Sequence, residues 1–117
     1  MQAILAAALT VHRALGPGLR ERSYQTCLKA ELRRRWLTVR TQVPILAEGF
    51  DVAPDGECRA DFVVAESVIV EIKAVSALRP VHEAQLLGYL RHLGLSAGLL
   101  INFNVVRLVD GVRRFLL

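Results

Sequence analysis

The chain has 117 residues, which is the size of one compact domain and leaves no room for a second independent core, so we expect a single domain over residues 1–117. Hydrophobic residues make up 53% of the chain and charged residues 22%, a balance that allows a real core to be buried. The formal net charge of +4 and the pI of about 9.7 favour a polyanionic partner such as nucleic acid, although this signal is weak on its own.

Hydropathy and cysteine content add two expectations. The mean hydropathy of +0.36 is high for a soluble monomer of this size, so we expect some apolar surface to meet a partner, most simply in a homodimer. The two cysteines, Cys27 and Cys58, lack the spacing of a metal site, which predicts reduced thiols in a cytoplasmic protein rather than a disulfide framework.

The apolar start of the chain superficially resembles a signal peptide. It has no basic leader, however, and it runs directly into residues 10–13, which continue a helical pattern, so we interpret it as a helix. No stretch approaches the roughly 18 apolar residues that are needed to cross a bilayer, so we expect a soluble protein without membrane contact.

Two helices are predicted first. Apolar residues recur at helical spacing over residues 2–15, and the Gly-Pro-Gly sequence at 16–18 ends this helix. The same spacing recurs over residues 21–36, where a separate face is basic and is expected to meet solvent. The basic face carries Arg22, Lys29 and Arg33.

Three consecutive strands follow, because β-branched residues and short apolar runs replace the helical pattern. These runs cover residues 39–46, 58–65 and 68–75. Asp55 and Gly56 mark a turn before the second strand, and residues 65–67 form a tight loop before the third. The second and third runs are nearly continuous in apolar residues, which predicts strands in the middle of a sheet.

The last third of the chain adds a helix, a strand and a hairpin. Helical periodicity runs over residues 81–93, with a proline before it and a glycine after it. Residues 99–103 read as another buried strand. Residues 105–117 are predicted to fold as a hairpin about Asp110 and Gly111.

The second and third predicted strands carry charged residues among their apolar ones. Asp61 is followed ten residues later by Glu71, and Lys73 stands two positions further on. Residues two apart on a strand point to the same side, so Glu71 and Lys73 project together. Their strand is otherwise apolar, where unpaired charge is costly, so a compensating partner is expected.

Whether Asp61 shares that face depends on the register of the two strands. If residues 65–67 form an odd-length loop, antiparallel pairing places Asp61 opposite Glu71, with both carboxylates on one side. A two-residue turn would instead pair Asp61 with Ile72 and separate the carboxylates unless a bulge intervenes. Both registers are compatible with the sequence.

Two facing carboxylates raise each other's pKa unless a cation lies between them, and an oxygen-rich pair suits Mg²⁺ or Mn²⁺. With Lys73 beside it, such an ion would lower the pKa of a bound water and neutralise charge on a phosphate under attack, which is the chemistry of phosphodiester hydrolysis. The alternative is a metal-free ion pair of Lys73 with Asp61 or Glu71, which the spacing permits equally well.

Gly18, Glu21 and Tyr24 have the spacing that names the GxxExxY proteins, and the chain resembles that family. Further blocks typical of the family follow in its order: Gln42-Val43-Pro44, Arg59-Ala60-Asp61, Val70-Glu71-Ile72-Lys73-Ala74, His82-Glu83-Ala84-Gln85-Leu86-Leu87 and Leu100-Ile101-Asn102-Phe103. The resemblance covers nearly the whole chain.

That family is assigned to the PD-(D/E)XK nuclease superfamily. The resemblance therefore implies an α/β fold with a restriction-endonuclease-like core, in which helices flank a central mixed β-sheet. It also implies a metal-dependent nuclease in which Asp61 and Glu71 bind the metal and Lys73 is catalytic. The superfamily often adds a carboxylate from the helix before the sheet, here Glu21, as a catalytic and metal-binding residue. It often has a glutamine near the active site on the later helix, which makes Gln85 a catalytic accessory.

The sequence also predicts contacts to nucleic acid. His82, Gln85 and Tyr89 form a polar stripe on the third helix that can border a cleft, although a structural role is the preferred interpretation for His82. The predicted contacts are Tyr24, Tyr89, His82, Arg22, Lys29 and Arg33. For the basic residues a solvated helix face is the preferred interpretation, and for Glu21 the alternative is a favourable charge at a helix N-terminus.

The favoured function is a Mg²⁺- or Mn²⁺-dependent nuclease that acts on nucleic acid, with DNA preferred as the substrate. The alternative is a non-catalytic domain of the same fold that binds nucleic acid or a protein partner. A structural dimerisation module is a third reading, and it predicts a large apolar interface and an occluded cleft.

Overall fold

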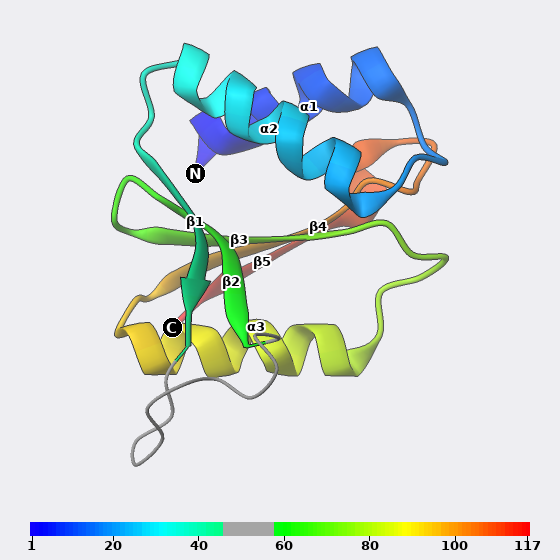
Figure 1. Ribbon diagram of the computed structural model, residues 1–117. Coiled ribbons are helices and arrows are strands. Elements are labelled where there is room, and N and C mark those ends of the chain that lie inside the picture. The colour runs from blue at the N-terminus through cyan, green and yellow to red at the C-terminus, as the bar shows by residue number, and fades with distance from the viewer. Residues whose placement is uncertain (46–57) are drawn as a thin grey trace.

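A computed structural model describes residues 1–45 and 58–117. Helices flank a five-stranded mixed sheet, as the resemblance implied (Figure 1). The elements are α1 (Gln2–Leu15), α2 (Glu21–Arg34), β1 (Val39–Pro44), β2 (Arg59–Val64), β3 (Val68–Lys73), α3 (Pro80–Leu93), β4 (Ala97–Asn102), the 3₁₀ helix η2 (Leu108–Gly111) and β5 (Val112–Leu116). The predicted elements up to residue 103 are confirmed within a few residues at their ends, where helices fray and strand pairing stops.

The strands lie in the order β1-β2-β3-β4-β5, so β3 is central and β2 lies beside it, as predicted. Neighbouring strands are antiparallel except for β3 and β4, which are parallel. A parallel pair needs a crossover connection, and α3 provides it on one face of the sheet. Helices α1 and α2 cover the opposite face, which gives three layers (Figure 1).

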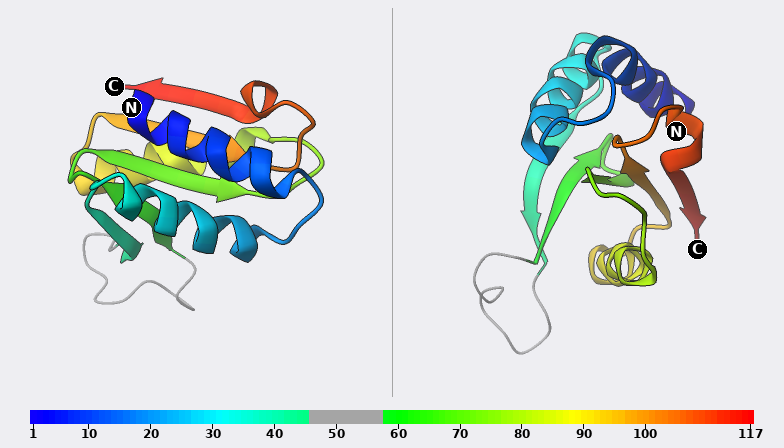
Figure 2. Two further views of the ribbon diagram at one scale, coloured as in Figure 1. Left: turned by 90° about the horizontal axis from the view of Figure 1, so that it is seen from above. Right: turned by 90° about the vertical axis from the view of Figure 1, so that its right-hand side faces the viewer.

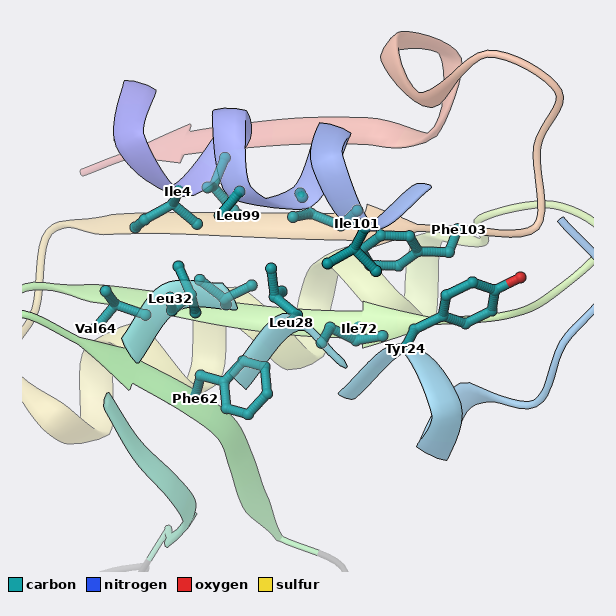
Figure 3. Packing of buried hydrophobic residues seen from close by; sticks show 14 of the residues in the cluster. Ile4, Tyr24, Leu28, Leu32, Phe62, Val64, Ile72, Leu99, Ile101 and Phe103 are labelled. Atoms are coloured by element: carbon teal, nitrogen blue, oxygen red, sulfur yellow. The ribbon is translucent and has the colours of Figure 1, made fainter. Parts of the chain in front are cut away.

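The core between the sheet and the first two helices, which we call the α1–α2 core, is apolar throughout. Its side chains include Ile4, Tyr24, Leu28, Leu32, Phe62, Val64, Ile72, Leu99, Ile101 and Phe103 (Figure 3). The rings of Tyr24 and Phe103 stack with centroids 4.7 Å apart and planes 10° apart. Helical spacing on α2 and strand alternation on β3 both direct apolar side chains into this core, so it accounts for both sequence patterns.

A second core, the α3 core, packs the other face of the sheet against α3. Its members include Val43, Ala60, Val63, Ile69, Leu86, Tyr89, Leu90 and Leu100. Both β1 and β2 contribute to it because the sheet curves and these two strands reach down beside α3 (Figure 2). The curvature places the middle of β1 and β2 where the two cores meet.

In strands β1 and β2, the face to which alternate side chains point changes at Gln42 and Asp61. Phe62 belongs to the α1–α2 core, whereas Ala60, two positions away on the same strand, belongs to the α3 core. Regular alternation would put both on one face, so the strand twists at the residue between them. The two strands keep one register on either side of this point, and Gln42 there has a φ of 51°. Asp61 therefore occupies a kink.

The predicted hairpin over residues 105–117 is wrong. This segment forms η2 and then one strand, β5, which pairs with β4 instead of with a partner of its own. Gly111 lies against the backbone oxygen of Asn102, where any side chain would collide. The glycine is thus required by a close approach of two backbones, and the Asp-Gly pair does not form a two-residue turn.

Apolar side chains also remain at the surface. Trp36 lies two residues after the end of α2 and is 94% exposed, and Val106 is 87% exposed. Within the two described ranges, no helix combines the length and the apolar character that crossing a membrane requires. The turn predicted at Asp55 and Gly56 lies outside the described residues.

Candidate active site

The connection between β2 and β3 decides the register that the sequence left open. Val64 pairs with Val68, so three residues separate the strands and the loop has odd length. Ala65 and Glu66 adopt left-handed φ values of 52° and 55° to make this reversal. Continuing the register past the last recorded pair places Asp61 opposite Glu71, with both carboxylates toward α3.

At Asp61 and Glu71, the hydrogen bonds between β2 and β3 run from backbone N–H groups to side-chain carboxylates. The Ile72 N–H donates to Asp61 Oδ2 at 2.8 Å, and the Asp61 N–H donates to Glu71 Oε1 at 3.2 Å. Each carboxylate is therefore oriented by the main chain of the neighbouring strand. Among the described residues no N–H group donates to the second oxygen of either carboxylate, Asp61 Oδ1 or Glu71 Oε2. Each carboxylate thus keeps an oxygen for a ligand.

Burial makes this pair of carboxylates costly when both are charged. Asp61 is 8% exposed and Glu71 is 3% exposed. Burial, the neighbouring Asp61 charge and a side-chain hydrogen bond with Asp61 raise the pKa of Glu71 to about 9, against the smaller lowering effect of Lys73. In the metal-free protein the pair therefore holds a proton at neutral pH.

Lys73 extends from the same face of β3 as Glu71. Its Nζ donates to Gln85 Oε1 on α3 at 3.4 Å. Of the ion pairs between described residues, none includes Lys73, Asp61 or Glu71. The alternative of a closed salt bridge from Lys73 to either carboxylate is therefore not what the structure contains, and the lysine remains free to meet an anion.

Helix α3 forms the wall opposite the acidic pair. Tyr89 is 6% exposed, and burial followed by the charges of Glu71, Cys58 and Asp61 raises its pKa to about 12. A hydroxyl that stays protonated beside carboxylates is available as a hydrogen-bond donor. His82 lies at the helix start, where its Nδ1 accepts from the Arg79 N–H at 3.0 Å. That cap supports the structural reading of His82.

The motif residues Gly18, Glu21 and Tyr24 build the entry to α2. The Tyr24 hydroxyl donates to the Gly16 oxygen at 2.6 Å and accepts from the Leu19 N–H at 3.1 Å. Gly18, with a φ of 94°, donates its N–H to the side chain of Asn104 at 3.0 Å. Tyr24 and Asn104 together fix the loop that directly precedes Glu21. Tyr24 is 0% exposed, which is incompatible with the direct contact to nucleic acid that we predicted for it.

Glu21 stands near the acidic pair without joining it. Its pKa is raised by burial and then by the charge of Asp61, and lowered by Lys73, so the three groups feel one another electrostatically. Its Oε1 accepts from Gln25 at 3.2 Å. Outside the range 46–57, no three acidic, histidine or cysteine side chains converge enough to hold a metal ion. The metal-binding role of Glu21 thus stays a prediction.

Asn102 is a supporting residue to which the sequence reading gave no role. It is 2% exposed, its side chain donates to the Val75 oxygen at 2.9 Å, and it accepts from the Val75 N–H at 3.1 Å. These bonds fix the chain directly after Lys73. A polar residue at the end of a buried strand was the available signal, because such a group must find partners.

The site has the donor chemistry of a divalent metal centre. Two buried carboxylates meet here, and burial together with the Asp61 charge raises the pKa of Glu71 to about 9. A hard cation such as Mg²⁺ or Mn²⁺ prefers oxygen ligands and provides a counter-charge. Asp61 and Glu71 therefore fit this role.

The comparison with protein families agrees with this geometry. The family model of the PD-(D/E)XK nuclease superfamily matches residues 1–115. The chain therefore belongs to the PD-(D/E)XK nuclease superfamily. No curated protein matches the chain in sequence, and no solved structure matches it.

Proposed function

We propose that this protein is a metal-dependent nuclease that hydrolyses phosphodiester bonds of nucleic acid, with DNA as the first substrate to test. Asp61 and Glu71 hold Mg²⁺ or Mn²⁺, Lys73 is catalytic and Gln85 assists it. The observation that carries the proposal is the pair of buried carboxylates, each oriented by a main-chain N–H and each with an oxygen to spare. Membership of a nuclease superfamily supports the same reaction.

The chemistry that a bound divalent ion supplies is Lewis-acid activation of water and neutralisation of phosphate charge. The residues of the chain contribute position and charge. Lys73 directs its ammonium group toward the non-bridging phosphate oxygens, where negative charge builds up during attack. Gln85 accepts from Lys73 and limits the directions in which that ammonium group points. Tyr89 and its apolar neighbours on α3 shield one side of the pair from water.

The net reaction adds water across a P–O bond. The water oxygen bonds to phosphorus, the bond to the leaving sugar oxygen breaks, and that oxygen takes up a proton. A general base and a proton donor are both needed. Because burial and the Asp61 charge raise the pKa of Glu71, a cation held by Asp61 and Glu71 would favour the ionised form of Glu71, so metal binding would be coupled to proton release there.

The test is cleavage by the purified protein with Mg²⁺ or Mn²⁺ on single-stranded, duplex and branched DNA, and on RNA. We expect the wild type to cleave at least one substrate and both Glu71→Ala and Lys73→Ala to lose roughly a thousandfold in rate, as removal of a main electrostatic group does. If no substrate is cleaved, or the two variants cleave like the wild type, the protein is no nuclease and the non-catalytic alternative takes its place.

Metal binding is tested separately by calorimetry. We expect binding of Mn²⁺ that releases protons and that disappears in the Glu71→Gln variant, which keeps the shape of the side chain and removes its charge. Glu21→Gln is informative beside it. A loss of affinity there would support Glu21 as a further ligand, whereas unchanged affinity would limit the ligands from this chain to Asp61 and Glu71.

Two finer parts of the proposal concern family and assembly. The Gly18, Glu21 and Tyr24 motif supports placement among the GxxExxY proteins, because Gly18 and Tyr24 hold the chain directly before α2, which begins at Glu21. Exposed apolar side chains such as Trp36 and Val106 support a homodimer. Sedimentation at micromolar concentration measures the mass, and a monomer there would contradict the dimer.

A further inference from the structure

A polar groove of about 190 Å³ lies between α2 and β1. Its walls include Arg22, Gln25 and Lys29 from α2, Thr41 and Gln42 from β1, and Phe62 from β2. Cationic, amide and hydroxyl groups predominate, which distinguishes it from the apolar groove between α1 and β5. The groups that face it are the ones that contact phosphate and sugar in complexes with nucleic acid.

The groove adjoins the candidate active site at three points. Gln25 donates to Glu21, Phe62 directly follows Asp61, and Gln42 stands in β1 opposite Asp61 in the strand register. The same residues that line the groove therefore touch or flank the acidic residues of the site.

The charge of the groove is not neutralised by the part of the protein that the structure describes. On α2, Glu31 pairs with Arg34 and Arg35, but no carboxylate of a described residue forms an ion pair with Arg22 or Lys29. Lys29 is half-buried and Arg22 is exposed, so one cation lies in the wall and the other at its rim. This arrangement suits an anion that is repeated along a chain.

The conformation of Gln42 points in the same direction. Among the described residues, four non-glycine residues have a positive φ. Ala65 and Glu66 make a tight turn and Trp36 follows the end of a helix, where left-handed conformations are common. Gln42 alone has this conformation inside a strand, where it costs roughly 1 kcal/mol or more. This strained residue, Gln42, is one of those that line the groove.

We propose that this groove binds the backbone phosphates of one nucleic-acid strand, next to the phosphodiester bond that lies at Asp61 and Glu71. Arg22 and Lys29 contact phosphates, and Gln42 contacts a phosphate or a sugar. The inference rests on the proposed function for the place of the cleaved bond, but strand binding by the groove is measurable without cleavage.

The experiment measures binding of labelled single-stranded oligonucleotides by fluorescence anisotropy in EDTA, where no cleavage occurs. The groove variant combines Arg22→Ala and Lys29→Ala. The control combines Arg13→Ala and Arg107→Ala, which removes the same charge from exposed positions outside the groove. We expect the groove variant to bind roughly a hundredfold more weakly, about tenfold for each lost contact, and its salt slope to fall by about 1.4. The control should stay within about threefold of the wild type.

Gln42→Gly tests the strained position without threatening the fold, because glycine accepts the left-handed conformation. We expect a melting temperature equal to or above that of the wild type together with binding that is several-fold weaker. A peptide nucleic acid, whose backbone is uncharged, should bind the wild type and the groove variant alike. DNA and RNA arms identify which sugar is preferred, and duplex of the same length should compete less well than the single strand.

The inference is overturned if the groove variant binds like the wild type, if the control loses as much affinity, if duplex competes as well as the single strand, or if the wild type binds no oligonucleotide. It is separable from the nuclease proposal. If binding depends on the groove but no substrate is cleaved, the proposal of strand binding by the groove stands and the nuclease proposal is refuted. If the wild type cleaves but the groove variant binds as well as the wild type, the nuclease proposal stands and strand binding by the groove is refuted.

Discussion

The face of β3 toward α1 and α2 is apolar along its whole length, whereas the face toward α3 changes from apolar to charged halfway along the strand. Val70 and Ile72 on the first face are 0% exposed within the α1–α2 core. On the second face, Ile69 packs in the α3 core and Glu71 and Lys73 follow it. One strand thus anchors the fold through one face and presents chemistry on the other, and the anchored face holds the charged one in position.

The largest effect should come from the apolar face. Ile72→Ala removes a fully buried side chain, so we expect a loss of about 2–5 kcal/mol of unfolding free energy. The Ile72 N–H that orients Asp61 remains, so the folded fraction should cleave at nearly the wild-type rate. Urea unfolding and cleavage at low temperature measure the two quantities. Full folding with lost cleavage would contradict the independence of the faces.

The charged face predicts a dependence of stability on pH. The pKa of Glu71 is about 9 in the folded protein and near its ordinary value of 4.5 when unfolded. The contribution of Glu71 to the free energy of unfolding is therefore fully present below about pH 4.5. It is lost as the pH rises toward 9, by at most about 1.4 kcal/mol per pH unit. Urea unfolding in EDTA between roughly pH 5.5 and 8.5 should reveal the decline.

Glu71→Gln is the matched control for this decline, because it cannot ionise. We expect it to unfold with a shallower pH dependence than the wild type and to exceed the wild type in stability at alkaline pH. Adding Mn²⁺ should stabilise the wild type more at high pH than at low pH, since the ion binds the ionised pair. The same slope in the variant and the wild type would contradict the assignment to Glu71.

A smaller effect is expected where the apolar core controls the position of an acidic residue. Tyr24→Phe keeps the stacking on Phe103 but loses the bonds to the Gly16 oxygen and the Leu19 N–H. We expect a loss of about 1–2 kcal/mol of unfolding free energy. Cleavage should fall further than it does in Ile72→Ala at equal folded fraction, because the loop before Glu21 is released. Unchanged cleavage in Tyr24→Phe would mean that the Tyr24 hydroxyl contributes to stability and not to the position of Glu21.

The smallest effect should be at Gln85, whose bond to Lys73 is exposed and 3.4 Å long. For Gln85→Ala we expect cleavage to fall by about threefold to tenfold, with the unfolding free energy within about 0.5 kcal/mol of the wild type. Glu83→Ala on the same helix is the control, since Glu83 contacts Arg113 and lies outside the site. Equal losses in both variants would mean that the helix, and not the bond to Lys73, was affected.

Local sequence patterns predicted most of the fold. Periodicity located α1, α2, α3 and the first four strands because burial on one face repeats at a regular interval. The error at residues 105–117 has a tertiary cause. Gly111 is required by the nearby backbone of Asn102, which is nine positions away along the chain and invisible to a turn signature.

The candidate site was predictable in part. Strand parity placed Glu71 and Lys73 together, but the position of Asp61 depended on a loop whose φ values the sequence does not reveal. The spacing of Tyr24 was informative while its contacts were not, because burial against Phe103 is decided by a strand far along the chain. The left-handed conformation of Gln42 has no residue-type signal at all, since glutamine does not favour it.

Trp36 is the only tryptophan of the chain, and its 94% exposure has a spectroscopic consequence. The indole already meets water in the folded protein, so its emission should change little when the chain unfolds, and circular dichroism is the better probe for the stability measurements. Covering of that surface by a second chain would move the indole into an apolar environment. Tryptophan emission that shifts to shorter wavelength with rising protein concentration would thus report assembly separately from folding.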